Sequence, residues 1–128
     1  MGRYLLDTHA AIWFLIGDDK LSDTVRRIIE EDSSLIYMSV VSAWELAIKI
    51  SIGKLRFPGN SAGFIQMAKN DDITILSIKA AHLAALEGLP LIHRDPFDRL
   101  LIATAQAEGL TLITVDENIA RYDVPHVW

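Results

Sequence analysis

The sequence predicts a three-layer α/β/α sandwich with a central parallel sheet of four to five strands. Short runs of apolar and often β-branched residues alternate along the chain with longer segments of helical periodicity. The short runs are apolar throughout, as expected of parallel strands that helices cover on both faces. The length of 128 residues suits a single domain, 1–128.

The strand-like runs are bounded by charged residues or by turn-forming residues. The first of them stops abruptly at Asp7, a charge that a buried strand does not tolerate in its interior. Strands are expected at Arg3–Leu6, Leu35–Val41, Ile73–Ser77 and Leu110–Val115, with the last residues as the candidate for a short edge strand.

The segments between these runs have apolar residues at helical spacing. In the clearest of them Pro96 suits the first helical position and Gly109 suits the C-terminal stop. Helices are expected at Ala10–Ile16, Leu21–Glu31, Ser42–Ile52, Ser61–Asn70, Ala80–Leu86 and Asp95–Glu108.

Composition excludes several classes of protein. The chain lacks cysteine, which rules out disulfides, zinc–thiolate sites and cysteine nucleophiles. It has no apolar stretch long enough for a membrane helix and no visible secretory signal, so a cytoplasmic protein is expected. A net charge of −5 argues against a broad basic face that grips phosphates, although bound Mg²⁺ would invert the sign locally.

Four acidic residues lie where hydrophobic runs stop: Asp7 in YLLDTH, Glu45 in SVVSAWELA, Asp98 in HRDPFDRLLIA and Asp116 in LITVDEN. The ends of parallel strands, and the starts of the helices that follow, share one edge of a sheet. These carboxylates can therefore meet in one pocket, where two charges about 4 Å apart repel by roughly 4 kcal/mol at an effective dielectric near 20. Either some of them are protonated or a hard divalent metal lies among them.

A purely structural explanation is also open, because helix N-termini favour acids. Asp95 is suited to cap the helix that begins at Pro96, with Asp98 as its capping-box partner. Ser42 and Glu45 also have capping-box spacing, and Asp7 and Asp116 can cap the segments that follow them. Caps gather at the same edge as an active site, so position alone does not separate the two explanations.

Two details favour a catalytic or metal-binding role for these acids. Asp7 and Asp116 end strands that should be central, where an unpaired carboxylate is costly. If the second strand gives way to helix near Ser39, Glu45 lies inside that helix and is not a cap.

The remaining polar and aromatic residues give weaker signals. The four histidines have no zinc-ligand spacing, and an ordinary surface or buried role is the default for His93, although it could touch a phosphate beside Arg94. Trp13 and Trp44 have apolar neighbours and are expected in core or interface packing. A basic rim or ordinary solvated charges both fit Lys49, Lys54, Arg56, Arg94 and Arg99.

Over nearly its whole length the chain resembles the PIN-domain family, in particular the VapC-like toxins of type II toxin–antitoxin pairs. The resemblance rests on LLDTHAAIWFL, SVVSAWELAIKISIGKL and HRDPFDRLLIATAQAEGLTLITVDENI, in that order. It implies an endoribonuclease in which Asp7, Glu45, Asp98 and Asp116 bind Mg²⁺ or Mn²⁺, and a metal-activated water attacks the RNA. Asp95 is interpreted first as a helix cap and second as a ligand, and Thr114 as a hydrogen-bond donor behind the ligands.

The resemblance also implies an RNA substrate, a cognate antitoxin protein and a homodimer. Two rival functions stay open. One is a PIN-like domain that binds RNA or protein without cutting it. The other is a phosphoacceptor receiver domain, which the lack of any lysine after Lys79 and of an acid beside Asp7 disfavours.

Overall fold

In the computed structural model, which describes residues 2–128, five strands form one parallel sheet in the order β3-β2-β1-β4-β5. The strands are β1 (Arg3–Leu6), β2 (Leu35–Ser39), β3 (Thr74–Leu76), β4 (Thr111–Ile113) and β5 (His126–Val127). The predicted central parallel sheet is confirmed, with the last residues supplying the short edge strand.

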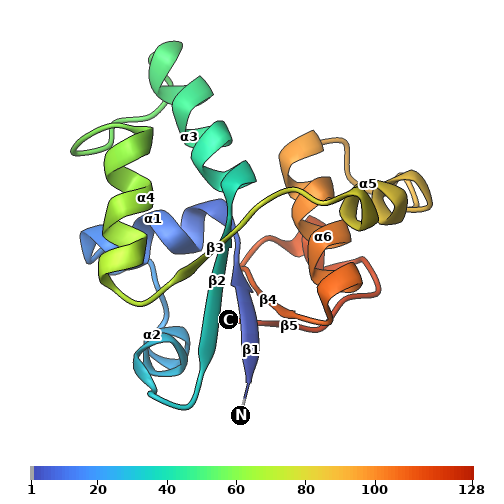
Figure 1. The fold of residues 1–128 in the computed structure, drawn as a ribbon, viewed down its shortest axis with the longest axis horizontal. Helices are drawn as coiled ribbons and strands as arrows, with labels where there is room; N and C mark the ends of the chain where they lie inside the picture. The colour runs from blue at the N-terminus through green and yellow to red at the C-terminus, as the bar shows by residue number, and fades with distance from the viewer. Residues whose placement is uncertain (1) are drawn as a thin grey trace.

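Helices cover both faces of this sheet. They are α1 (Thr8–Ile16), α2 (Asp23–Glu30), α3 (Val40–Ser51), α4 (Ser61–Asn70), α5 (Ala80–Glu87), α6 (Pro96–Glu108) and α7 (Glu117–Ala120). Helices α1 to α4 gather on one side of the sheet and α5 and α6 on the other (Figure 1). The three-layer α/β/α arrangement is therefore confirmed.

The two hydrophobic cores follow from the two-residue period of a strand. Leu6 and Ile113 point into the core beneath α1 to α4, whereas Leu5 and Leu112 point into the core beneath α6. Each of these side chains is fully buried. Because both faces of the central strands are buried, their sequences are apolar throughout rather than alternating.

The chain order places β1 beside β4 at the centre of the sheet. From β1 the chain first builds outward through β2 and β3, and it then returns to add β4 and β5 on the other side. The N–H of Asp7 donates to the carbonyl of Ile113 over 3.0 Å, which joins the ends of the two central strands. This reversal of strand order is where open α/β sheets form binding crevices.

The expected boundary between β2 and α3 is wrong by two residues. The strand ends at Ser39 and the helix begins at Val40, because the Ser39 hydroxyl accepts a hydrogen bond from the N–H of Val41 at 3.1 Å and caps the helix. The capping box expected between Ser42 and Glu45 is therefore absent. Instead Glu45 lies in the second turn of α3.

The C-terminal third differs from expectation in its details. Strand β4 ends at Ile113 rather than Val115, and the turn expected after Asp116 is a short helix, α7. Across residues 2–128, none of the helices combines the length and the apolar character needed to cross a membrane.

Candidate metal centre

All four predicted acids line one pocket of about 390 Å³ at the edge of the sheet where β1 and β4 end. They arrive from different elements: the N-terminus of α1, the second turn of α3, the first turn of α6 and the N-terminus of α7. The pocket is lined by Asp7, His9, Trp13, Glu45, Lys49, Asp95, Asp98, Val115 and Asp116.

Asp7 is both a helix cap and a buried member of the pocket. Its Oδ1 accepts the N–H of Ala10 at 2.8 Å, and the residue is only 6% exposed. Burial raises its pKa to about 6, and the nearby charges of Asp116 and Glu45 add to the rise. The Thr114 hydroxyl and the Ala10 N–H oppose the rise without cancelling it.

Asp98 lies on the opposite wall, in the first turn of α6. Asp95 caps that helix by accepting the N–H of Asp98 at 3.0 Å, as predicted. The carboxylate of Asp98 does not complete the expected capping box but bonds Nε2 of His93 at 2.8 Å. Burial raises the pKa of Asp98 to about 6, and repulsion from Asp95, Glu45 and Asp116 contributes to the rise.

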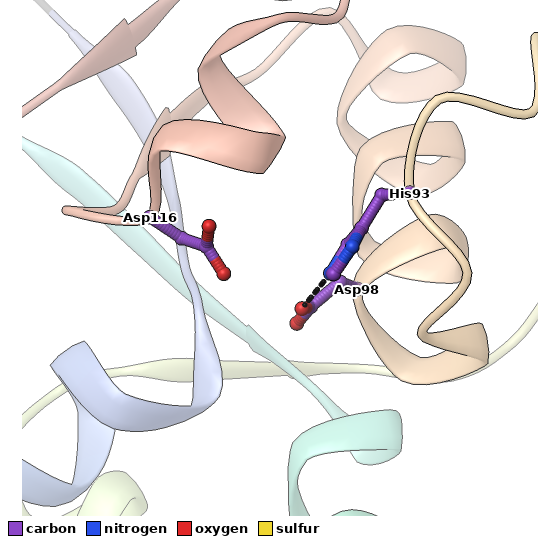
Figure 2. Close-up of side chains that lie close together, drawn as sticks. All are labelled: His93, Asp98 and Asp116. Atoms are coloured by element: carbon purple, nitrogen blue, oxygen red, sulfur yellow. Dashed lines mark hydrogen bonds and ion pairs between the residues drawn. The ribbon is translucent and has the colours of Figure 1, made fainter.

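Asp116 reaches the same pocket from the N-terminus of α7. Its Oδ1 accepts the N–H of Asn118 at 2.8 Å and caps α7, while its own N–H donates to the Thr114 hydroxyl at 3.0 Å. The side chains of Asp116, Asp98 and His93 point toward one another (Figure 2). Each offers one ligand atom, and the three atoms lie within 4.8 Å of one another.

His93 is the member of the site that sequence reasoning missed. It lies in the segment before α6, which has no helical or strand period to place it. Two contacts fix this segment: the Tyr122 hydroxyl accepts the N–H groups of Ile92 at 3.0 Å and of His93 at 2.8 Å. Arg99 donates to the same hydroxyl at 3.1 Å and to the carbonyl of Pro90 at 2.9 Å, so it supports the segment and does not form part of a basic rim.

Glu45 differs from the other acids because both of its oxygens have strong partners. The Thr8 hydroxyl donates to Oε1 at 2.7 Å, and Lys49, one turn further along α3, lies 2.5 Å from Oε2. The glutamate is only 2% exposed, so this ion pair neutralises a buried charge. Lys49, which was expected among solvated charges or a basic rim, instead lines the pocket.

The donor set suits a divalent cation. Carboxylate oxygens are the ligands that Mg²⁺ and Mn²⁺ prefer, and a single imidazole among them is compatible with a transition ion such as Mn²⁺. The raised pKa values of Asp7 and Asp98 show that the protein alone leaves their charge poorly compensated. A bound cation would supply that compensation.

Two comparisons of the sequence with known proteins give related matches. Residues 4–125 match the PIN domain family model. Ribonuclease VapC22 of Mycobacterium tuberculosis is 27% identical over 132 residues, with all of both chains covered.

Two solved structures share the fold. A chain of VapBC2 from Rickettsia felis, bound to a DNA fragment from its promoter, superposes with a TM-score of 0.71 at 16% identity, covering 98% of this chain and 97% of that one. A chain of DNA-bound VapBC from Salmonella typhimurium gives 0.72 at 16% identity, with 99% and 98% covered.

Proposed function

The chain belongs to the PIN domain family, and from that premise we propose that it is a metal-dependent endoribonuclease, the toxin of a type II toxin–antitoxin pair. The observation that carries the proposal is the convergence of four acids from four separate segments on one pocket. The full-length similarity to a ribonuclease toxin supports the choice of RNA as substrate. The match to the PIN model favours this function over the receiver-domain alternative.

In the proposed site Asp98 and Asp116 hold the cation, and Asp7, which lines the same pocket, is proposed as a further ligand. His93 either adds a nitrogen ligand or holds Asp98 in place through their 2.8 Å hydrogen bond. The bound cation would lower the pKa of a water molecule and stabilise charge on the cleaved phosphodiester. Mg²⁺ fits the carboxylates alone, and a ligating imidazole would shift the preference toward Mn²⁺.

Glu45 is proposed to position the attacking water rather than to bind the cation. Both of its oxygens already have partners, Thr8 and Lys49, so its charge is less available to a cation than that of the other three acids. Lys49 lines the same pocket, where its ammonium group would also meet the phosphate of the substrate. This places a positive charge next to RNA in a pocket that is otherwise acidic.

The same proposal includes partners. The two structural relatives are VapBC complexes bound to DNA, which supports a cognate antitoxin as a partner; the proposal is that this antitoxin covers the pocket. A homodimer is proposed as the assembly, and exposed apolar side chains such as Ile52 and Leu91 supply surface for such contacts.

The test is cleavage of RNA by the purified protein in Mg²⁺, in Mn²⁺ and in EDTA. An Asp116→Asn variant tests the pocket, and Glu117→Gln, the neighbouring exposed acid outside it, is the matched control. We expect cleavage that needs the metal, persists in Glu117→Gln and falls at least 100-fold, by estimate, in Asp116→Asn.

Cleavage that continues unchanged in EDTA or in Asp116→Asn would refute the assignment. RNA binding without any cleavage, in either metal, would favour the alternative of a catalytically silent PIN-like binding domain.

A further inference from the structure

One wall of the acidic pocket is aromatic. His9 and Trp13 are four residues apart on α1 and so lie on the same face of that helix. Their rings are 5.6 Å apart between centroids, and both line the pocket together with Val115, which is 49% exposed. Asp7 caps the same helix, so one short segment of sequence supplies both a proposed cation ligand and the aromatic wall.

The wall is held in place by further contacts. Trp128 packs edge-on against Trp13 at 5.8 Å, and the ammonium group of Lys20 lies 5.7 Å from the centre of the Trp13 ring. Trp13 is partly buried against the core, whereas His9 is exposed. The expectation of core or interface packing for Trp13 is therefore incomplete, because the ring also contributes to the pocket surface.

The pocket is larger than a hydrated cation needs. Six water molecules at about 30 Å³ each occupy roughly 180 Å³, less than half of the 390 Å³ available. The same pocket is also lined by His9, Trp13 and Val115, which offer a surface suited to a flat, uncharged, aromatic group.

RNA offers such a group beside every phosphate. A chain of net charge −5 has no excess of basic residues to hold the RNA backbone, so contacts to the bases would add affinity that the net charge does not supply. Stacking of bases on aromatic side chains is an established source of affinity for single-stranded nucleic acid, and it does not depend on net charge.

We propose that His9 and Trp13 form a nucleobase subsite, which holds the base next to the scissile phosphate while that phosphate lies at the acids. This inference rests on the proposed ribonuclease function and adds how the substrate is held. Because a base must leave its helical stack to reach the wall, the subsite selects single-stranded RNA.

The experiment compares one single-stranded RNA oligonucleotide that the protein cuts with the same oligonucleotide lacking the bases that flank the cut. KM is measured for the unmodified protein, His9→Ala and Trp13→Leu, and Trp44→Ala serves as a matched control. Trp44 is 53% exposed and packs on Phe97 outside the pocket lining. Mn²⁺ affinity is measured by titration for every variant.

We expect His9→Ala and Trp13→Leu to raise KM about 10-fold for the complete RNA, within the range for loss of one stacked base. For the abasic RNA, the KM of the unmodified protein should already be about as high as that of the variants for the complete RNA. The two substitutions should raise the KM for the abasic RNA little further. Mn²⁺ affinity should stay the same in both variants. Since His9 is exposed, His9→Ala remains informative even where Trp13→Leu folds poorly.

If the two substitutions raise KM equally for the complete and the abasic RNA, or raise it for neither, the subsite is wrong. The proposed ribonuclease function would not be affected by that result. A drop in Mn²⁺ affinity would also overturn the subsite, because the two residues would then act through the metal. If the unmodified protein neither binds nor cuts any RNA, the proposed function fails and the subsite fails with it.

Discussion

Replacing Asp7 with asparagine should abolish RNA cleavage and yet stabilise the metal-free protein. The pKa of Asp7 rises from 3.8 to about 6 because the carboxyl is buried and faces the charges of Asp116 and Glu45. Asparagine removes that charge but keeps an oxygen that can accept the N–H of Ala10, and the two residues are about equally good helix caps.

The size of the effect follows from the pKa. One unit corresponds to 1.36 kcal/mol, so a carboxyl that is ionised in both folded and unfolded states opposes folding by about 3 kcal/mol at pH 7.5. At pH 5 the folded state is mostly protonated at Asp7, and the opposing free energy falls to about half of that value. Below about pH 3 it vanishes, because the carboxyl is then protonated in both states.

The assay is urea unfolding in EDTA at pH 5 and at pH 7.5, with Asp19→Asn, an exposed acid outside the pocket, as the control. We expect Asp7→Asn to exceed the unmodified protein in stability at both pH values, with the larger margin at pH 7.5. The reasoning is refuted if the variant is the less stable protein at pH 7.5, or if its margin does not grow with pH.

Three further predictions concern the metal and the fold. Addition of Mg²⁺ or Mn²⁺ at about 100 times its Kd should raise the free energy of unfolding by about 2.7 kcal/mol, and calorimetry of Asp116→Asn should show no such gain. Tyr122→Phe should cost about 1–3 kcal/mol in urea unfolding, because the N–H groups of Ile92 and His93 lose their acceptor; a loss below about 0.5 kcal/mol would contradict that contact. Ser39→Ala should cost about 1 kcal/mol by removing the cap of α3, whereas Ser39→Thr, which keeps a hydroxyl at this buried position, should lose less.

The sequence was sufficient to predict that four acids gather at one edge of the sheet, although Asp95, expected first as a helix cap, also lines the pocket. Asp7 and Asp116 follow buried apolar runs, and in a parallel sheet such positions fall on one edge whatever the details of the helices. An error of two residues in the start of α3 does not move Glu45 away from that edge, since the residue stays within the first two turns of the helix.

The features that the sequence did not predict depend on contacts made by segments without helical or strand periodicity. His93 reaches Asp98 only because Tyr122, almost thirty residues later, fixes the segment that precedes α6. The start of α3 was placed late because Val40 and Val41 favour a strand by local preference, and the Ser39 hydroxyl decides for the helix. Such side-chain to backbone bonds are visible only once the fold is known.

The structure also shows that a carboxylate that caps a helix is not thereby excluded from binding a metal. Asp7 and Asp116 each cap a helix through Oδ1, and Asp98 bonds His93 through Oδ2. A carboxylate has two oxygens, so one can accept a hydrogen bond while the other binds a cation. A cap is therefore no evidence against a ligand here, because the hydrogen bond fixes the carboxylate before the cation arrives. Glu45 has partners on both oxygens, and that difference is the physical reason to assign it a role apart from the other three acids.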